Sequence, residues 1–353
     1  MAEVARLAGV GTMTVSRVLN GSKNVNAKTA SRVQAAIERL GYRPNEFARV
    51  LRGAKSRSIG LIVPSLMDPF FAICAHNVNL VAQSHGYSMI LTASNGSIET
   101  EFSEAQWMLE KHVEGILICP TPARISKLSS TIFHRTPMVS FDRPLNIPRV
   151  ASVVVENSAG ARRMTEHLIE HGHKHIHFLG DSPHLFTIKT RVDGYRRALS
   201  LAGLATRVNL EADSQESVSN YVKEVMTERK PPTAFFGGNN RISRYLYRAI
   251  GQLGLSIPED VAVVGFDDFE MADMLQPPLT VVNQPVELLG RTAAEVLFSQ
   301  LKMNAEDRPE VGARTVLKVD LIVRSSCGCQ PIPQDDVLNP RASDPTKPQQ
   351  LVL

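Results

Sequence analysis

Short apolar runs rich in β-branched residues recur from residue 58 onward and alternate with helical stretches. They are SIGLIVP, YSMILTAS, VEGILICP, TPMVSFDR, HKHIHFLG, TAFFGG and VAVVGFDD. The runs are almost continuously apolar, as expected of strands in parallel sheets that are covered on both faces. Strands that alternate with helices indicate a doubly wound α/β architecture, and two sets of strands indicate two lobes.

The first 58 residues differ from the rest of the chain, because their sequence predicts short helices and no apolar strands of this kind. Residues 2–8, 12–19 and 27–40 are predicted to be helical. Ala5, Gly9 and Val15 suit two helices that cross over a short turn, since Ala5 permits close approach and Gly9 a left-handed turn. The spacing predicts a helix-turn-helix, with a generic helical hairpin as the alternative.

Charge is distributed unevenly between these two parts. Residues 1–58 hold 11 Lys and Arg against 3 Asp and Glu, whereas the rest of the chain holds 28 against 32. A basic head on a slightly acidic body indicates a module that binds a polyanion. Charge alone does not distinguish DNA, RNA and a membrane surface.

Other features indicate a cytoplasmic protein. No apolar run reaches the roughly 18 residues that suggest a membrane span, and Met1 leads directly into a mixed helix rather than a secretory signal. The four cysteines include Cys74 and Cys119 in apolar contexts, where we expect core residues in a reducing compartment.

Two long stretches closely resemble the lactose-repressor (LacI/GalR) family. They are GVGTMTVSRVLNGSKNVNAKT and LGYRPNEFARVLRGAKSRSIGLIVP, and the resemblance continues to about residue 326. It implies an all-α helix-turn-helix head and an α/β periplasmic-binding-protein-like two-lobed body, whose chain crosses between the lobes three times. The expected divisions are a DNA-binding domain at 1–44, a hinge helix and linker at 45–58, an effector-binding and dimerisation domain at 59–326, and a disordered tail at 327–353.

The resemblance also implies roles on DNA for the second helix. Base edges would be read by Thr12, Met13 and Arg17. The planar fork of Arg17 suits O6 and N7 of guanine. Phosphates would be contacted by Thr14, Ser16 and Asn20. For Thr14 and Ser16 the alternative is an ordinary exposed helix surface.

Residues 45–52 (NEFARVLR) correspond to the family's hinge helix, which forms when two subunits sit on DNA. Leu51 holds the position of the leucine that wedges into the minor groove, where an apolar wedge offsets unstacking by creating contact area. Two features depart from the family. Related chains begin the first helix earlier than Met1, which suggests a start upstream, and Gly11 replaces a Ser or Thr cap.

For the body, the resemblance implies an effector cleft between the lobes, lined by residues that follow strands. They are Asp68, Phe70, Phe71, Asp142, Arg143, Thr187, Arg191, Asn239 and Asp267. Carboxylates, amides and guanidinium groups suit vicinal hydroxyls, and an aromatic ring supplies an apolar floor. The alternatives are structural: Asp68 could cap a helix, Asp267 could lie in a loop, and Arg143 could pair with an acid.

This cleft also departs from the family pattern. Asn240 replaces a usual aspartate, Ser243 and Tyr245 replace Ala and Gly, and Asp213 stands where an aromatic residue often stacks on the ligand. The effector is expected to be a sugar or sugar acid, and these departures leave a phosphorylated compound, a modified ligand or a lost response as alternatives.

No metal site or cofactor is expected. Five histidines crowd into HLIEHGHKHIHFLG, but Gly172 ends the helix there, so we expect their side chains to diverge. Cys327 and Cys329, at the end of the body, are predicted to form a surface dithiol. The tail from residue 330 is rich in Pro, Gln and Asp, as in disordered segments, and lacks a leucine heptad, so a dimer is expected.

Together these features predict a homodimeric, sequence-specific regulator of transcription. It would bind a near-palindromic DNA operator, most simply as a repressor, and respond to a small carbohydrate-like effector. A solute-binding protein for transport would explain the body but not the basic head. An enzyme on the same scaffold is the third alternative, although no nucleophile elbow, phosphate loop or metalloprotease motif is present.

Overall fold

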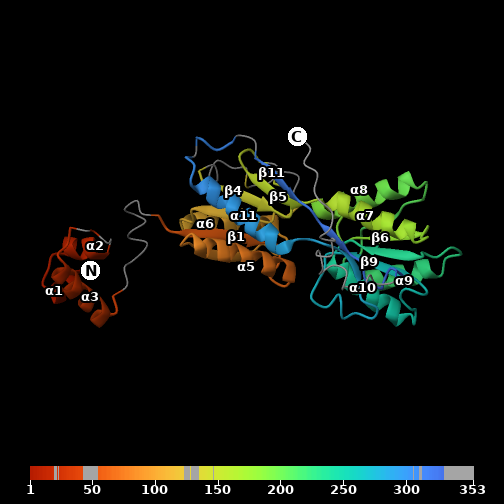
Figure 1. The fold of residues 1–353 in the computed structure, drawn as a ribbon, viewed down its shortest axis with the longest axis horizontal. Coiled ribbons are helices and arrows are strands. Elements are labelled where there is room, and N and C mark those ends of the chain that lie inside the picture. The colour runs from red at the N-terminus through yellow and green to blue at the C-terminus, as the bar shows by residue number, and fades with distance from the viewer. Residues whose placement is uncertain are drawn as a thin grey trace, which may run out of the picture. The chain divides into compact units, whose positions relative to one another are not determined.

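The chain divides into two units, residues 1–57 and residues 58 onward. The computed structural model describes residues 1–19, 22, 24–42, 55–122, 128, 135–145, 147–304, 306–309 and 312–329. The first unit contains three helices (Figure 1): α1 (Ala2–Ala8), α2 (Thr12–Leu19) and α3 (Ala27–Leu40).

A small apolar core holds these three helices together. Ala5 of α1 and Val15 of α2 are buried in it, together with Val33 of α3. Gly9 ends α1 with a φ of 61°, and a Cβ there would lie 2.7 Å from the guanidinium of Arg32. The arrangement is the helix-turn-helix that the spacing of Ala5, Gly9 and Val15 predicts.

Two six-stranded sheets form the second unit. The first has the order β11-β5-β4-β3-β1-β2, and all its pairings are parallel. Its strands are β1 (Ser58–Val63), β2 (Ser88–Ala93), β3 (Gly115–Ile118), β4 (Met138–Phe141), β5 (Ala151–Val155) and β11 (Arg314–Leu317).

The second sheet has the order β12-β10-β9-β8-β6-β7, and only its edge strand β12 is antiparallel. Its strands are β6 (Ile176–Leu179), β7 (Arg207–Asn209), β8 (Ala234–Gly237), β9 (Ala262–Phe266), β10 (Thr280–Asn283) and β12 (Asp320–Ile322). Each of the seven predicted runs contains one of these strands, whereas β5, β7, β10, β11 and β12 were not predicted.

Helices cover both faces of each sheet. Against the first sheet pack α5 (Pro69–Ser84) and α11 (Val286–Leu301) on one face and α6 (Ile98–Glu110) on the other. The second sheet has α7 (Asn157–Glu170) and α8 (Phe186–Leu201) on one face and α9 (Gln215–Met226) and α10 (Asn240–Gln252) on the other.

The strand period of two explains this layering. Ile59, Leu61 and Val63 of β1 belong to the core under α5 and α11, whereas Ile62 belongs to the core under α6. The strands are therefore apolar on both sides, which is why their sequences do not alternate. Among the described residues, no helix is both long and apolar enough to cross a membrane.

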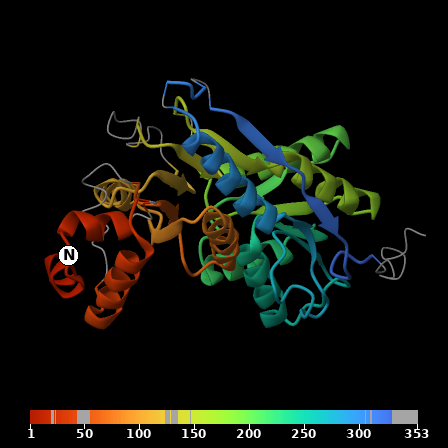
Figure 2. The same cartoon turned by 60° about the vertical axis from the view of Figure 1, so that its left-hand side comes forward.

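The chain passes between the two lobes three times. It leaves the first sheet between β5 and α7, returns between β10 and α11, and leaves again between β11 and β12. Figure 2 shows the dark-blue C-terminal segment running from one sheet to the other. The crossings bring the carboxyl ends of strands from both sheets to a shared region.

Candidate functional site

A cleft of about 900 Å³ opens between the lobes, lined by residues that directly follow strands of both sheets. Ligands of open α/β sheets bind at such carboxyl ends. The structure brings all nine predicted cleft residues to its walls, namely Asp68, Phe70, Phe71, Asp142, Arg143, Thr187, Arg191, Asn239 and Asp267. Contact of each with a ligand stays a prediction.

Arg191 is the most tightly held of these residues. Its side chain projects from α8, is 3% exposed, and lies 3.7 Å above the ring of Phe266. Nε donates to Asn157 Oδ1 at 2.8 Å, Nη1 donates to the Gly238 carbonyl at 2.8 Å, and Nη2 lies 3.4 Å from Asp267 Oδ1. Arg191 thus joins α7, the end of β8 and the end of β9.

Asp267 follows β9 with a φ of 75°, in the left-handed region. Burial raises the pKa of its carboxyl group, and the positive charge of Arg191 only partly opposes this. The side-chain amide of Gln284, which follows β10, also donates to Asp267. The carboxylate is therefore fixed from two sides at the wall of the cleft.

The first lobe contributes a second buried ion pair, between an aspartate and an arginine. Asp142 follows β4 with a φ of 63° and is 4% exposed. Its Oδ2 lies 3.3 Å from Arg143 Nε and accepts from the Cys119 thiol at 3.7 Å. Arg143 Nη1 donates to the Pro120 carbonyl at 3.2 Å. Arg143 therefore does pair with an acid, as the structural alternative predicted, while it also lines the cleft.

Asp68 and Asn239 are each held in place because they cap the first turn of a helix. Asp68 Oδ1 accepts from the Phe70 backbone N–H at 3.1 Å and so caps α5, while Asn239 Oδ1 accepts from Ile242 N at 2.9 Å and caps α10. The capping alternative for Asp68 therefore applies as well. Asn240 Nδ2 also donates to Asp68 Oδ1 across the cleft at 3.3 Å, joining the two lobes.

Sequence reasoning missed Asp181 and Gln284, which both line the cleft. Asp181 follows β6, and its Oδ2 accepts from Asn239 Nδ2 at 2.9 Å and from Arg241 Nη2 at 2.6 Å. Asp181 could have been recognised from its position, because it directly follows the apolar run HIHFLG in the same way that Asp142 directly follows MVSF.

Three polar atoms of the cleft residues are buried without a hydrogen-bond partner among the residues described. They are Arg143 Nε, Asp181 Oδ1 and Gln284 Oε1. Buried polar atoms are rarely left unpaired, so such atoms at a cleft point to a polar ligand. Two are acceptors, and the one donor, Arg143 Nε, already lies 3.3 Å from Asp142 Oδ2, so the acceptors point to a ligand that donates hydrogen bonds.

Two aromatic rings and Thr187 complete the walls. Phe70 and Phe71 lie edge to face with their centroids 5.1 Å apart, and Phe71 also packs into the core. Thr187, in the first turn of α8, is buried. Asp213 is exposed and does not line the cleft.

In the head, α2 presents most of the predicted DNA-contacting residues to solvent. Thr12, Met13 and Arg17 are exposed, with Met13 at 69%, whereas Val15 is completely buried on the opposite face. Thr14 and Ser16 are half-buried. Asn20 and Leu51 lie outside the described residues.

The structure places His177 apart on β6, but the rings of His167 and His171 lie together with their centroids 4.4 Å apart, so the expected divergence holds only in part. The structure also corrects the prediction for Cys327. His177 is buried on β6, where burial lowers its pKa to about 4, and its Nδ1 lies 3.0 Å from the Tyr221 hydroxyl. His167 and His171 lie on or beside the last turn of α7. Cys327 is 1% exposed and belongs to the core of the second lobe, so a surface dithiol was the wrong prediction.

Comparisons with known proteins match both units. A family described as bacterial regulatory proteins, lacI family, matches residues 1–45, and a periplasmic binding protein-like domain matches residues 165–327. The chain is 34% identical over 326 residues to the HTH-type transcriptional repressor PurR of Aliivibrio fischeri (strain MJ11), covering 89% of this chain and 96% of that protein.

A second relative and a solved structure agree with this. The HTH-type transcriptional regulator CelR of Thermobifida fusca is 32% identical over 339 residues, covering 92% of this chain and 96% of that protein. The lac repressor dimer bound to operator and the anti-inducer ONPF matches with a TM-score of 0.78 at 26% identity, covering 92% of this chain and 97% of that chain. This chain belongs to the LacI family of bacterial regulatory proteins and is a DNA-binding regulator of transcription.

Proposed function

We propose that this protein is a cytoplasmic repressor that binds a near-palindromic operator as a homodimer. A small polyhydroxylated effector, a sugar or sugar acid, binds in the cleft and changes the affinity for the operator. The names of the relatives support repression, and the chemistry of the cleft supports the class of effector.

The unpaired atoms of the cleft carry the effector proposal. Asp181 Oδ1 and Gln284 Oε1 need donors, whereas Arg143 Nε already faces the Asp142 carboxylate at 3.3 Å. A hydroxyl group donates one hydrogen bond and accepts others, so neighbouring hydroxyls on one ligand satisfy both acceptors. Arg191 has five N–H groups, so Nη2 can donate to the same ligand while Nε and Nη1 hold the protein.

The charges of the cleft favour a neutral or weakly acidic compound. Three of its four aspartates already face arginines: Asp142 faces Arg143, Asp267 faces Arg191, and Asp181 faces Arg241. A strongly charged ligand would compete with these pairs. A solved structure of CelR, 30% identical to this chain, is a complex with cellobiose, which supports a saccharide here.

For the operator, we propose that α2 enters the major groove. Thr12, Met13 and Arg17 lie on its exposed face and would read bases, while Thr14 and Ser16 would contact phosphates. Asn20 would add a phosphate contact, and Leu51 of the hinge helix would wedge into the minor groove at the operator's centre.

An apolar surface of the first lobe supports the dimer. Ile73 and Leu80 are two turns apart on α5 and are 38% and 48% exposed, and Leu91 on the adjacent edge strand β2 is 37% exposed. Exposed apolar patches mark association sites, and a two-fold axis through this one would pair it with itself.

The contact between Asp68 and Asn240 suggests how ligand and operator are coupled. It joins the lobes across the cleft, so a ligand that binds Asp68 or its neighbours changes the relative position of the lobes. The change shifts the affinity for DNA only if the two arrangements bind the ligand with different affinities.

The test is selection of sheared genomic DNA on the purified full-length protein at one near-physiological salt concentration, because nonspecific affinity depends steeply on salt. We expect enrichment of a few fragments that share an inverted repeat, and release of these fragments by one member of a panel of sugars and sugar acids. Arg17→Ala should lose the enrichment, whereas Arg39→Ala, exposed on α3, should keep it. No enrichment with the unaltered protein would refute the proposal.

A further inference from the structure

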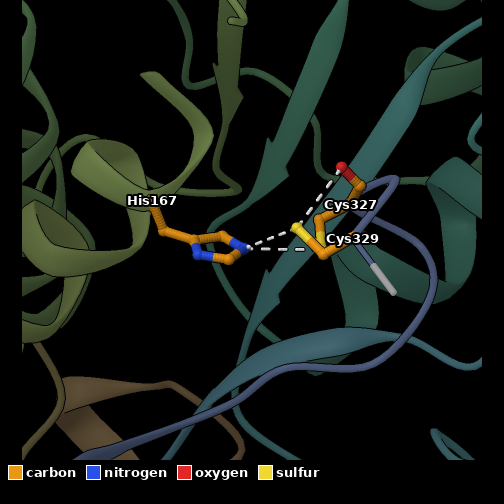
Figure 3. A group of neighbouring side chains, drawn as sticks. All are labelled: His167, Cys327 and Cys329. Atoms are coloured by element: carbon orange, nitrogen blue, oxygen red, sulfur yellow. Dashed lines mark hydrogen bonds between the residues drawn. The ribbon is translucent and has the colours of Figure 1, made fainter. Parts of the chain in front are cut away.

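One histidine and two cysteines that lie about 160 residues further along the chain converge away from the effector cleft. His167 projects from the last turn of α7 toward Cys327 and Cys329, as Figure 3 shows. Its Nε2 lies 3.4 Å from Cys327 Sγ and 3.3 Å from Cys329 Sγ, and all three atoms lie within 4.8 Å of one another. None of the three residues lines the cleft.

The local fold explains why both thiols face the same helix. Cys327 and Cys329 are separated by Gly328, which has a φ of 81° and lets the chain turn back on itself. The Gly328 N–H donates to the Ser325 carbonyl at 3.1 Å, which closes this turn. The Thr280 hydroxyl donates to Cys327 Sγ at 3.3 Å from β10. The position of Cys327 is therefore set by the sheet beneath it.

These distances suit a tetrahedral metal ion. Zinc bonds of about 2.3 Å to sulfur and about 2.0–2.1 Å to nitrogen place a sulfur and a nitrogen about 3.6 Å apart at a tetrahedral angle. The two observed sulfur–nitrogen distances, 3.4 Å and 3.3 Å, need to lengthen only slightly. The plain alternative is a pair of thiols that simply hydrogen-bond to an imidazole.

The donor set selects a class of metal. Thiolates and imidazole are ligands of thiophilic ions such as Zn²⁺, whereas Mg²⁺ and Ca²⁺ prefer oxygen. Cys327 is buried and Cys329 is half-buried, so one side of the cluster is enclosed and the other remains accessible to an ion and its water. We propose that His167, Cys327 and Cys329 bind one zinc ion, with water as the fourth ligand.

Binding would proceed without redox chemistry. Each thiol that bonds to zinc loses its proton to solvent, and the imidazole bonds through unprotonated Nε2. The ion would then link α7, the first helix after the chain enters the second lobe, to the last described turn of the body. Because this link exists only in the folded chain, zinc should also raise the temperature of unfolding.

The experiment uses the full-length protein without a polyhistidine tag, stripped of metal and kept reduced with a phosphine. Cobalt(II) serves as the spectroscopic probe, and Zn²⁺ is then added in competition with a chromophoric chelator. We expect a thiolate-to-cobalt charge-transfer band that saturates at one ion per chain and disappears when Zn²⁺ is added. The temperature of unfolding should rise with Zn²⁺.

Variants identify the ligands. His167→Ala and Cys329→Ser should each weaken Zn²⁺ binding by more than the roughly 10–100-fold that loss of an outer partner costs. The control is His175→Ala, which removes an exposed histidine of the same segment and should leave the affinity unchanged. Far-ultraviolet circular dichroism verifies that each variant is folded.

Two outcomes would overturn the proposal. One is the absence of a charge-transfer band in the reduced protein. The other is a band of equal intensity in the unaltered protein and in folded His167→Ala and Cys329→Ser, which would mean that the cobalt is bound by a cysteine outside the proposed ligand set.

Discussion

Asp142 and Asp267 hold their carboxylates at the cleft through an unusual backbone. Both have left-handed φ values, 63° and 75°, directly after a strand. For residues other than glycine such conformations cost roughly 1–2 kcal/mol, and they persist where the surrounding contacts fix them. Here Arg143 and Arg191 supply those contacts. These contacts therefore fix where the two carboxylates face the cleft.

The raised pKa of Asp267 predicts a pH dependence of stability. Because burial raises its pKa in the folded state above the ordinary 3.8, protonation favours folding. This contribution is complete below pH 3.8 and is lost as the pH rises through the folded-state pKa. Asp267→Asn cannot titrate, so the stability of the unaltered protein relative to this variant should fall as pH rises from 3.8 toward neutrality.

Urea unfolding midpoints across this range check the prediction. Asp213→Asn serves as the control, because it makes the same substitution at an exposed position outside the cleft. A relative stability that increases with pH would mean that Arg191 dominates over burial at Asp267.

The role proposed for Gln284 gives a second prediction at this scale. Gln284→Met removes an unpaired acceptor of the cleft, and loss of one neutral hydrogen bond of about 0.5–1.5 kcal/mol weakens effector binding by roughly 2- to 13-fold. Gln300→Met is the matched control, because Gln300 Oε1 is also buried and unpaired among the described residues but lies outside the cleft. Titration calorimetry with the effector measures both, and equal losses would contradict the role of Gln284.

Individual cleft residues were predictable where they follow a recognisable strand. Asp142 and Asp267 come directly after apolar runs that were predicted to be strands, so their position at a sheet edge follows from the sequence. Gln284 follows β10, which was not predicted, and its importance depends on Asp267, which β9 places beside it. Cys327 is buried because it packs into the core of the second lobe, and its neighbour His167 lies 160 residues earlier, so no local pattern reveals its position.

At the level of elements, edge position explains three of the five missed strands, namely β7, β11 and β12. The missed strands β7 and β12 have three residues each and lie at sheet edges, where partial exposure weakens the apolar pattern. β11 is also an edge strand, and half of its residues are exposed. Its place beside β5 is set by parallel pairing between segments far apart in the chain.

The apolar face of α5 predicts how the protein associates. Leu80→Glu would place a charge at the centre of the proposed dimer interface and should shift the protein to monomers. Leu201→Glu is the control, because Leu201 is 74% exposed at the end of α8 in the other lobe. Sedimentation velocity distinguishes the two states. If Leu80→Glu remains a dimer, the interface lies elsewhere.

At the scale of the molecule, the basic charge is concentrated in the smaller unit. Residues 1–58 carry a large excess of Lys and Arg, whereas the remainder is slightly acidic. The two binding functions should therefore respond differently to salt, because DNA binding releases counterions and binding of a neutral sugar does not.

This difference is measurable. If the operator complex neutralises 6–10 phosphates, operator affinity falls roughly 10³–10⁵-fold between 50 and 200 mM salt. Effector affinity should stay nearly constant over the same range. Fluorescence anisotropy with labelled operator and calorimetry with the effector give the two curves. An operator affinity that is insensitive to salt would contradict phosphate contacts by the basic head.

The order in which the strands enter the two sheets has a consequence for synthesis. β11 completes the edge of one sheet and β12 the edge of the other, and both come after residue 313. A ribosome must therefore translate almost the whole body before either lobe has all its strands. A nascent chain can fold its DNA-binding head long before its effector-binding domain is complete. Truncation of the messenger RNA near its 3′ end would therefore yield regulators that do not respond to the effector.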